Sequence, residues 1–208
     1  MILSLARVPG VVWLIFTACL LPEFYLSGAD LGLWGTPEAR NLAIDYFGFW
    51  PGPDNGALAQ YAGQRFVMFL SYAFLHAGLL HFGVNMATLF SLGPPVQRIL
   101  GSSRFLLLYL ALGVAGGLGY ALWPVGNLPM IGASGALFGL AGVILAWEVQ
   151  RRRLLHISLR PVINNVIYLV GLNVVLWAAL SGQLAWQTHL GGFIAGWAFA
   201  QFSSPYRR

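Results

Sequence analysis

Long apolar stretches without charged residues dominate the pattern of this chain. Three windows contain no Asp, Glu, Lys or Arg: 66–97, 105–147 and 161–206, which are 32, 43 and 46 residues long. A helix crosses the hydrocarbon core of a bilayer with about 20 residues. The second and third windows therefore each have room for two helices and a turn, and the first has room for one helix and an approach segment. Another apolar stretch lies near the N-terminus.

This pattern predicts six membrane-spanning helices. A transmembrane β-barrel would show segments of about ten residues that alternate between apolar and polar, whereas these windows are apolar throughout. We expect an all-α polytopic membrane bundle that forms a single domain over residues 1–208. The expected spans are 8–24, 79–97, 103–123, 134–150, 161–180 and 185–203.

The composition is typical of a membrane protein and gives no reason to expect a nucleic-acid partner. Hydrophobic residues make up 58% of the 208 residues and charged residues only 8%, with a formal net charge of +5. A basic chain can bind nucleic acid, but cytoplasmic loops of membrane proteins also collect arginine, and we expect no nucleic-acid partner. The first segment could be a cleaved signal peptide, but no small-x-small cleavage site precedes Pro22, which favours a retained helix.

The arginines predict the orientation. With the N-terminus inside, nine of the eleven arginines are cytoplasmic, and Arg40 and Arg65 are outside with five of the six acids. The positive-inside rule therefore favours both termini in the cytoplasm. A long external segment, about 25–78, is rich in Gly, Pro and aromatic residues, and we expect it to pack on or partly in the bilayer. The nine inside arginines are Arg7, Arg98, Arg104, Arg151, Arg152, Arg153, Arg160, Arg207 and Arg208.

Polar and ionisable residues inside or beside the spans are candidates for function, because burying them in lipid is costly. His81 and Asn85 are four residues apart and share one face of the second span, and His76 precedes it. His189 lies in the outer third of the sixth span. His156 lies in the basic cytoplasmic loop, where we expect solvent to surround it.

Ser134 opens the fourth span within the small-residue run 132–135, and Gly192 and Gly196 form a small-xxx-small face on the sixth. Small residues often serve packing alone, and each feature by itself fits that interpretation. Together they predict that the two spans approach closely, which brings Ser134 to His189 as nucleophile and base. No acid lies at that depth in any span, so the prediction is a dyad without a third carboxylate.

These residues resemble the rhomboid family of intramembrane serine proteases over nearly the whole chain, in its minimal six-helix bacterial form. The family pattern is matched by 132–135 at the head of the fourth span, by His76, His81 and Asn85, and by His189 with its two glycines. The resemblance implies a Ser134 nucleophile and a His189 base. It also implies oxyanion donors from His81, Asn85 and the Ser134 amide, with His76, Gly132 and Phe138 lining the site, Phe138 by stacking on the base.

One departure from the family pattern concerns the external segment. Family members usually carry a Trp-Arg pair eight to nine residues before the first histidine, but here Val67 and Met68 occupy those positions. The nearest basic residue is Arg65. Loop packing or substrate access is therefore expected to differ, while the dyad positions match.

The resulting hypothesis is an intramembrane serine endopeptidase in the bacterial inner membrane. Its expected partners are transmembrane protein substrates and the lipid bilayer, with no cofactor and no metal, and the oligomeric state stays open. The fifth span carries bulky residues such as Trp177 and lacks the glycine spacing of its neighbour, so it is the expected gate. The alternatives are a catalytically inactive rhomboid-like binder or chaperone, and a proton-coupled transporter, which should show repeats and intramembrane carboxylates.

Overall fold

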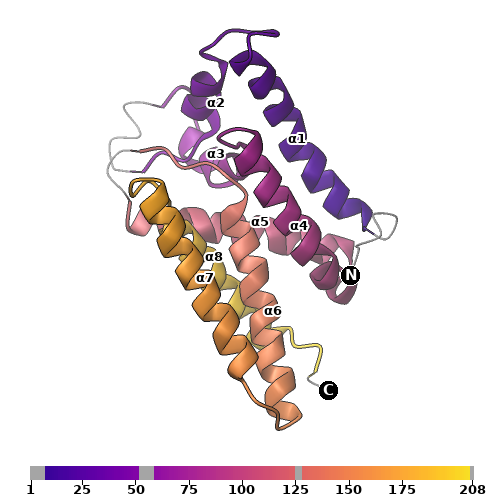
Figure 1. Ribbon diagram of the computed structural model, residues 1–208. Coiled ribbons are helices and arrows are strands. Elements are labelled where there is room, and N and C mark those ends of the chain that lie inside the picture. The colour runs from indigo at the N-terminus through magenta and orange to yellow at the C-terminus, as the bar shows by residue number, and fades with distance from the viewer. Residues whose placement is uncertain (1–7, 52–58, 125–127, 207–208) are drawn as a thin grey trace.

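The computed structural model describes residues 8–51, 59–124 and 128–206 (Figure 1). Arg7, Asp54, Arg207 and Arg208, which entered the charge argument, lie outside the described residues. The helices are α1 Gly10–Asp30, α2 Ala39–Phe47, α3 Gln64–Ser71, α4 Leu79–Leu100, α5 Ser102–Leu122, α6 Ser134–Leu154, α7 Arg160–Ala179 and α8 Trp186–Phe202, with a 3₁₀ turn η3 Tyr72–Phe74 between α3 and α4.

The predicted all-α membrane bundle is confirmed, and a long helix lies at each of the six expected positions. By length and composition alone, α1, α5 and α7 can each cross a membrane, and α3 with η3 and α4 forms a fourth candidate that is bent by 82°. Helices α6 and α8 are not among these candidates: α6 ends in a turn with three arginines, and α8 has only 17 residues. In the described part of the chain, β-pairing is limited to one isolated bridge between Phe49 and Met130.

The external segment is more helical than the sequence pattern indicated. Helix α1 continues through Pro22 to Asp30, because the turns after the proline pack inward and bury Glu23, Leu26 and Ser27. Helices α2, α3 and η3 also lie within residues 25–78, where we expected a loop. Their packing against α1 and α5 holds this segment over the end of the bundle where α6 begins (Figure 1).

The predicted close approach of the fourth and sixth spans is confirmed in the contact between α6 and α8. A Cβ atom added at Gly192 would lie 2.0 Å from the carbonyl oxygen of Gly135, and one at Gly196 would lie 1.9 Å from that of Gly139. Only glycine leaves room for such backbone contact. The two helices therefore touch through their main chains along this face.

Five of the six long helices contribute to one apolar core. Val12, Leu89, Phe105, Leu140 and Ala200 come from α1, α4, α5, α6 and α8 in that order, and each is fully buried. Helix α7 contributes no residue to this cluster, and within α7 only Val162 is buried. Of the six long helices, α7 is thus the one that the core holds least.

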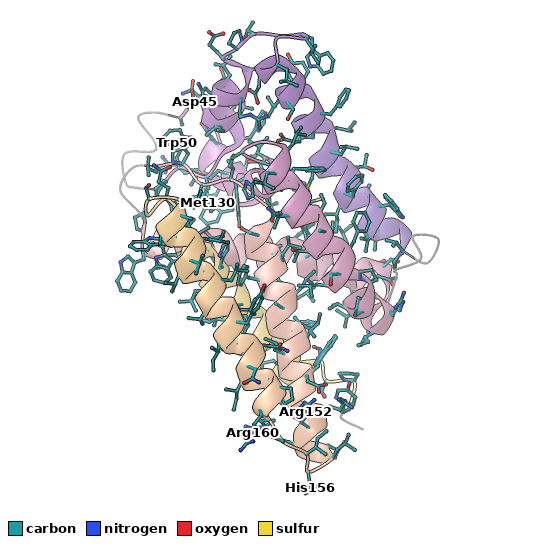
Figure 2. All side chains as sticks on the ribbon, in the orientation of Figure 1. Asp45, Trp50, Met130, Arg152, His156 and Arg160 are labelled. Carbon is teal, nitrogen blue, oxygen red and sulfur yellow. The ribbon has the colours of Figure 1, made fainter. Side chains whose placement is uncertain are left out.

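The two ends of the bundle differ in charge. Arg152, His156 and Arg160 gather at one end, around the turn between α6 and α7, while Asp45 and Trp50 lie toward the other (Figure 2). His156 is exposed, as expected for a solvated loop residue. At 1.5 Å per residue, the 21 residues of α6 separate Ser134 from the arginine-rich end by roughly 30 Å.

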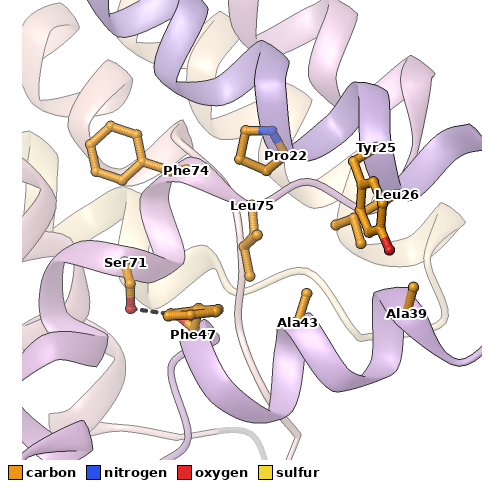
Figure 3. Close-up of a pocket in the computed structure, with 9 residues that line it drawn as sticks. All are labelled: Pro22, Tyr25, Leu26, Ala39, Ala43, Phe47, Ser71, Phe74 and Leu75. Carbon is orange, nitrogen blue, oxygen red and sulfur yellow. Dashed lines mark hydrogen bonds between the residues drawn. The ribbon is translucent and has the colours of Figure 1, made fainter. Parts of the chain in front are cut away.

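A cavity of about 440 Å³ lies between α1 and the external segment (Figure 3). Its wall is almost entirely apolar, and Ser71 directs its hydroxyl to the carbonyl oxygen of Phe47, at 2.7 Å. The lining residues are Pro22, Tyr25, Leu26, Ala39, Ala43, Phe47, Ser71, Phe74 and Leu75. None of them is a candidate catalytic residue, so this cavity lies apart from the site described below.

The α6–α8 contact gives a stability prediction. Gly196→Ala should lower the free energy of unfolding by about 1–3 kcal/mol, because the new methyl group forces two backbones apart. Gly171→Ala in α7 is the matched control, since its Cβ would meet no atom within 4 Å. Thermal unfolding in detergent measures both variants. Equal melting temperatures for the two variants would show that the contact is less tight than described.

Candidate active site

Ser134 and His189 face each other at the N-terminal ends of their helices. Ser134 is the first residue of α6, and His189 lies in the first turn of α8. The Ser134 Oγ and His189 Nε2 atoms are 2.8 Å apart. Gly135 allows this approach, because a Cβ there would lie 2.7 Å from Thr188 Cγ2 at the start of α8.

The ring of His189 is held in a fixed plane. Phe138, one helical turn after Ser134, stacks on it with a centroid distance of 4.1 Å and an interplanar angle of 5°. The imidazole is 7% exposed. Helix α6 therefore supplies both the hydroxyl group that the imidazole contacts and the aromatic surface against which it rests.

The other nitrogen of His189 contacts a residue that the sequence analysis missed. Asn173 of α7 places its Oδ1 atom 2.5 Å from His189 Nδ1. A third member was expected only among carboxylates, and no carboxylate lies at this depth in any span. An amide in the middle of an otherwise apolar span carries the same desolvation cost as the polar residues that were singled out, and that signal points to Asn173.

His81 lies beside Gly132, close to Ser134, and a backbone hydrogen bond sets its tautomer. The Ala77 amide donates to His81 Nδ1 at 3.2 Å, so in the neutral ring Nε2 carries the proton. A Cβ added at Gly132 would lie 2.9 Å from His81 Nε2 and 3.9 Å from Ser134 Oγ. The space beside Gly132 thus borders both an N–H donor and the serine hydroxyl.

Gly132 also has a backbone that favours glycine. Its φ is +124°, and its N–H donates to the carbonyl oxygen of Tyr72 at 2.9 Å. That amide is therefore occupied by a structural bond. The Ser134 amide belongs to the first turn of α6, where N–H groups have no acceptor within the helix. The N-terminal end of the helix dipole adds partial positive charge at this point.

The remaining predicted residues, Asn85 and His76, lie behind His81. Asn85 is buried, and its Nδ2 donates to the carbonyl oxygen of His81 at 2.8 Å. The His76 ring is fully buried and packs edge-on against His81, with centroids 5.2 Å apart. Both residues therefore support His81, and the structure records no contact between either of them and Ser134.

Arg40 anchors the external segment, a role that the sequence analysis did not assign to it. It pairs with the buried Glu23 of α1 at 3.0 Å, bonds Asp30 at 2.7 Å, and donates to the carbonyl oxygen of His76 at 2.6 Å. Burial lowers the pKa of Arg40, but hydrogen bonds to Glu23 and Asp30 outweigh it and raise that pKa above its ordinary value. The charged guanidinium of Arg40 thus links the external segment to α1 and to the backbone of His76. This link exists in a chain that has Val67 and Met68 at the positions of the family's Trp-Arg pair.

This arrangement has the parts needed for acyl transfer. A hydroxyl faces an imidazole nitrogen, the His81 ring borders the space beside Gly132, and Ser134 itself begins α6. Within the described residues, no group of three His, Cys, Asp or Glu side chains could hold a metal ion.

Fold and site together define a helical membrane protein with a serine–histidine pair at the end of the bundle away from its arginine-rich turn. The family model described as the Rhomboid domain matches residues 63–206, which is 144 of the 208 residues. The chain belongs to the rhomboid family.

Curated relatives agree with this assignment. The chain is 37% identical over 122 residues to "Rhomboid protease GluP" of Bacillus subtilis, covering 59% of this chain and 23% of that protein. It is 33% identical over 123 residues to "Putative rhomboid protease YdcA" of the same organism, covering 59% of each. "Rhomboid protein 1, mitochondrial" of Saccharomyces cerevisiae is 32% identical over 192 residues, covering 86% of this chain and 51% of that protein. The chain thus spans about a quarter to three fifths of the length of these relatives.

Proposed function

We propose that the protein is an intramembrane serine endopeptidase that hydrolyses peptide bonds in or near transmembrane segments of other membrane proteins. The observation that carries this proposal is the 2.8 Å contact between Ser134 Oγ and His189 Nε2 at the head of α6. Relatives named as rhomboid proteases support it. An inactive binder or chaperone would not need this pair, so retention of both residues in bonding geometry favours the protease.

In the proposed reaction, His189 Nε2 takes the proton of the Ser134 hydroxyl as Oγ attacks the carbonyl carbon of the substrate. The imidazolium then gives that proton to the leaving amine, which leaves an acyl group on Ser134. Water, activated by the same nitrogen, releases the acyl group and restores the serine. Phe138 keeps the ring in plane through both half-reactions.

Negative charge on the tetrahedral oxygen is stabilised by donors beside Gly132. His81 Nε2–H borders this space, the Ser134 amide in the first turn of α6 is the second proposed donor, and the helix dipole favours an anion there. Asn85 holds the His81 carbonyl and has a second amide hydrogen available. His76 packs behind His81 and limits its movement. Gly132 leaves the space open, because a side chain there would contact His81.

A transmembrane substrate reaches this site sideways, and α7 is the proposed gate. Its one buried residue is Val162, and a cavity of about 480 Å³ lies between α7 and the α6–α8 pair. The substrate helix has to unwind locally, because helical carbonyls are engaged in hydrogen bonds. Helix-breaking residues near the outer end of the substrate therefore favour cleavage.

The first functional prediction concerns the pair itself. Ser134→Ala and His189→Ala should each abolish cleavage of a transmembrane substrate, because either loss removes the proton-transfer unit. Membrane fragments released by wild type and variants are compared by gel, with helical content measured by circular dichroism as the control. Cleavage by Ser134→Ala at the wild-type rate would rule out this mechanism.

A second prediction separates the residues of α4. His81→Ala should lower kcat by roughly 10²–10³-fold, as expected for a lost oxyanion donor, with little change in KM. Asn85→Ala should impair turnover in the same direction, because Asn85 bonds the His81 carbonyl. Steady-state kinetics in proteoliposomes measures both variants. Full activity in both would assign this helix face a purely structural role.

The orientation gives a third prediction. We place the arginine-rich end of α6 and α7 in the cytoplasm and the active site at the outer side of a bacterial inner membrane. In a Cys19→Ser background, Thr36→Cys should react with an impermeant maleimide added to intact cells, and Leu155→Cys should not. Both positions are exposed on the protein surface. The reverse labelling pattern would invert the topology.

A further inference from the structure

Asn173 is a polar residue in an apolar setting. Leu172 and Val174 flank it in α7, and it lies on the wall of the 480 Å³ cavity together with His189 and several apolar side chains. An amide without hydrogen-bond partners would cost several kcal/mol in such surroundings. Both ends of this amide have partners, and their identities decide what the residue does.

The contacts fix which way the amide points. The Nδ2 atom donates to the carbonyl oxygen of Leu169 at 2.9 Å, four residues back on the same helix. The Oδ1 atom therefore faces His189 Nδ1 and can only accept. The opposite orientation would set Oδ1 against the Leu169 oxygen, so two acceptors would meet.

This orientation determines the tautomer of His189. An acceptor at Nδ1 requires that nitrogen to carry the proton, which leaves Nε2 with a lone pair toward Ser134. Stacking on Phe138 does not make this selection, because both tautomers of the ring stack equally well. The hydrogen bond to Asn173 removes that freedom.

We propose that Asn173 is a positioning residue that holds His189 in the Nδ1–H tautomer and is the third member of a hydrogen-bonded Ser134–His189–Asn173 triad. The inference rests on the proposed function and adds a third member from α7. Asn173 exchanges no proton: the serine proton moves to Nε2 and later to the leaving amine, while Nδ1 keeps its own proton throughout. The neutral oxygen of the amide also stabilises the imidazolium formed between these steps.

Three variants test the role in kinetics. Asn173→Leu keeps the size of the side chain and removes the acceptor, so kcat should fall by roughly 10- to 100-fold with KM within about twofold of wild type. With its carboxyl group in the neutral form, Asn173→Asp can donate its O–H to the Leu169 carbonyl oxygen and accept from His189 Nδ1, so it should recover most of the lost rate. Asn165→Leu, an exposed asparagine on the same helix, is the matched control and should match wild type.

A spectroscopic readout separates positioning from a merely structural role. In ¹⁵N-histidine-labelled protein, the His189 signals are assigned by their loss in His189→Gln. Wild type and Asn173→Asp should show the proton on Nδ1, and Asn173→Leu should shift the population toward the Nε2–H form. An unchanged tautomer together with an unchanged kcat in Asn173→Leu would overturn the proposal.

The same experiment keeps this proposal distinct from the proposed function. If Asn173→Leu changes the tautomer while Ser134→Ala still cleaves substrate, the positioning role stands and the Ser134 nucleophile fails. If Ser134→Ala is inactive and Asn173→Leu is wild type in both readouts, the dyad stands and the third member fails.

Discussion

The site depends on one packing contact, the backbone-to-backbone approach of α6 and α8. Gly192 and Gly196 of α8 press against the carbonyl oxygens of Gly135 and Gly139, with no room for a methyl group. Ser134 and His189 lie at the N-terminal end of this contact. The contact therefore sets the 2.8 Å distance between Ser134 Oγ and His189 Nε2. Between membrane helices the driving force is close packing rather than hydrophobic burial, so a glycine-lined contact can hold the Ser134 and His189 side chains at bonding distance.

Two elements beside this helix pair differ in how firmly they are packed. Helix α7 contributes no residue to the apolar core and contacts His189 through Asn173. The external segment is instead tied to α1 and to the backbone of His76 by the charged Arg40. Under the two proposals, substrate access and the orientation of the His189 ring both depend on α7, the long helix with one buried residue, whereas Arg40 anchors the external segment.

The sequence alone predicts much of this arrangement, for reasons that can be stated. Charge-free windows located the long helices, and glycine spacing indicated that the segments bearing Ser134 and His189 would meet. The stacked position of Phe138 agrees with what the family resemblance implied. Helices α2 and α3 were not predicted, because their burial depends on packing against α1 and α5. Asn173 was missed because only a carboxylate was expected as a third member, although an amide within an apolar span is itself a signal. Arg40 was missed because its partners Glu23 and His76 are distant in sequence.

The central claim is that Ser134 is the nucleophile and that His189 activates it. Labelling of the membrane-embedded protein with a serine-directed phosphonate, followed by mass spectrometry of its peptides, tests this claim most directly. The account predicts one covalent adduct, on the peptide that contains Ser134, and its loss when His189 is replaced by Ala. An adduct on another serine, or undiminished labelling of Ser134 in the absence of His189, would contradict it.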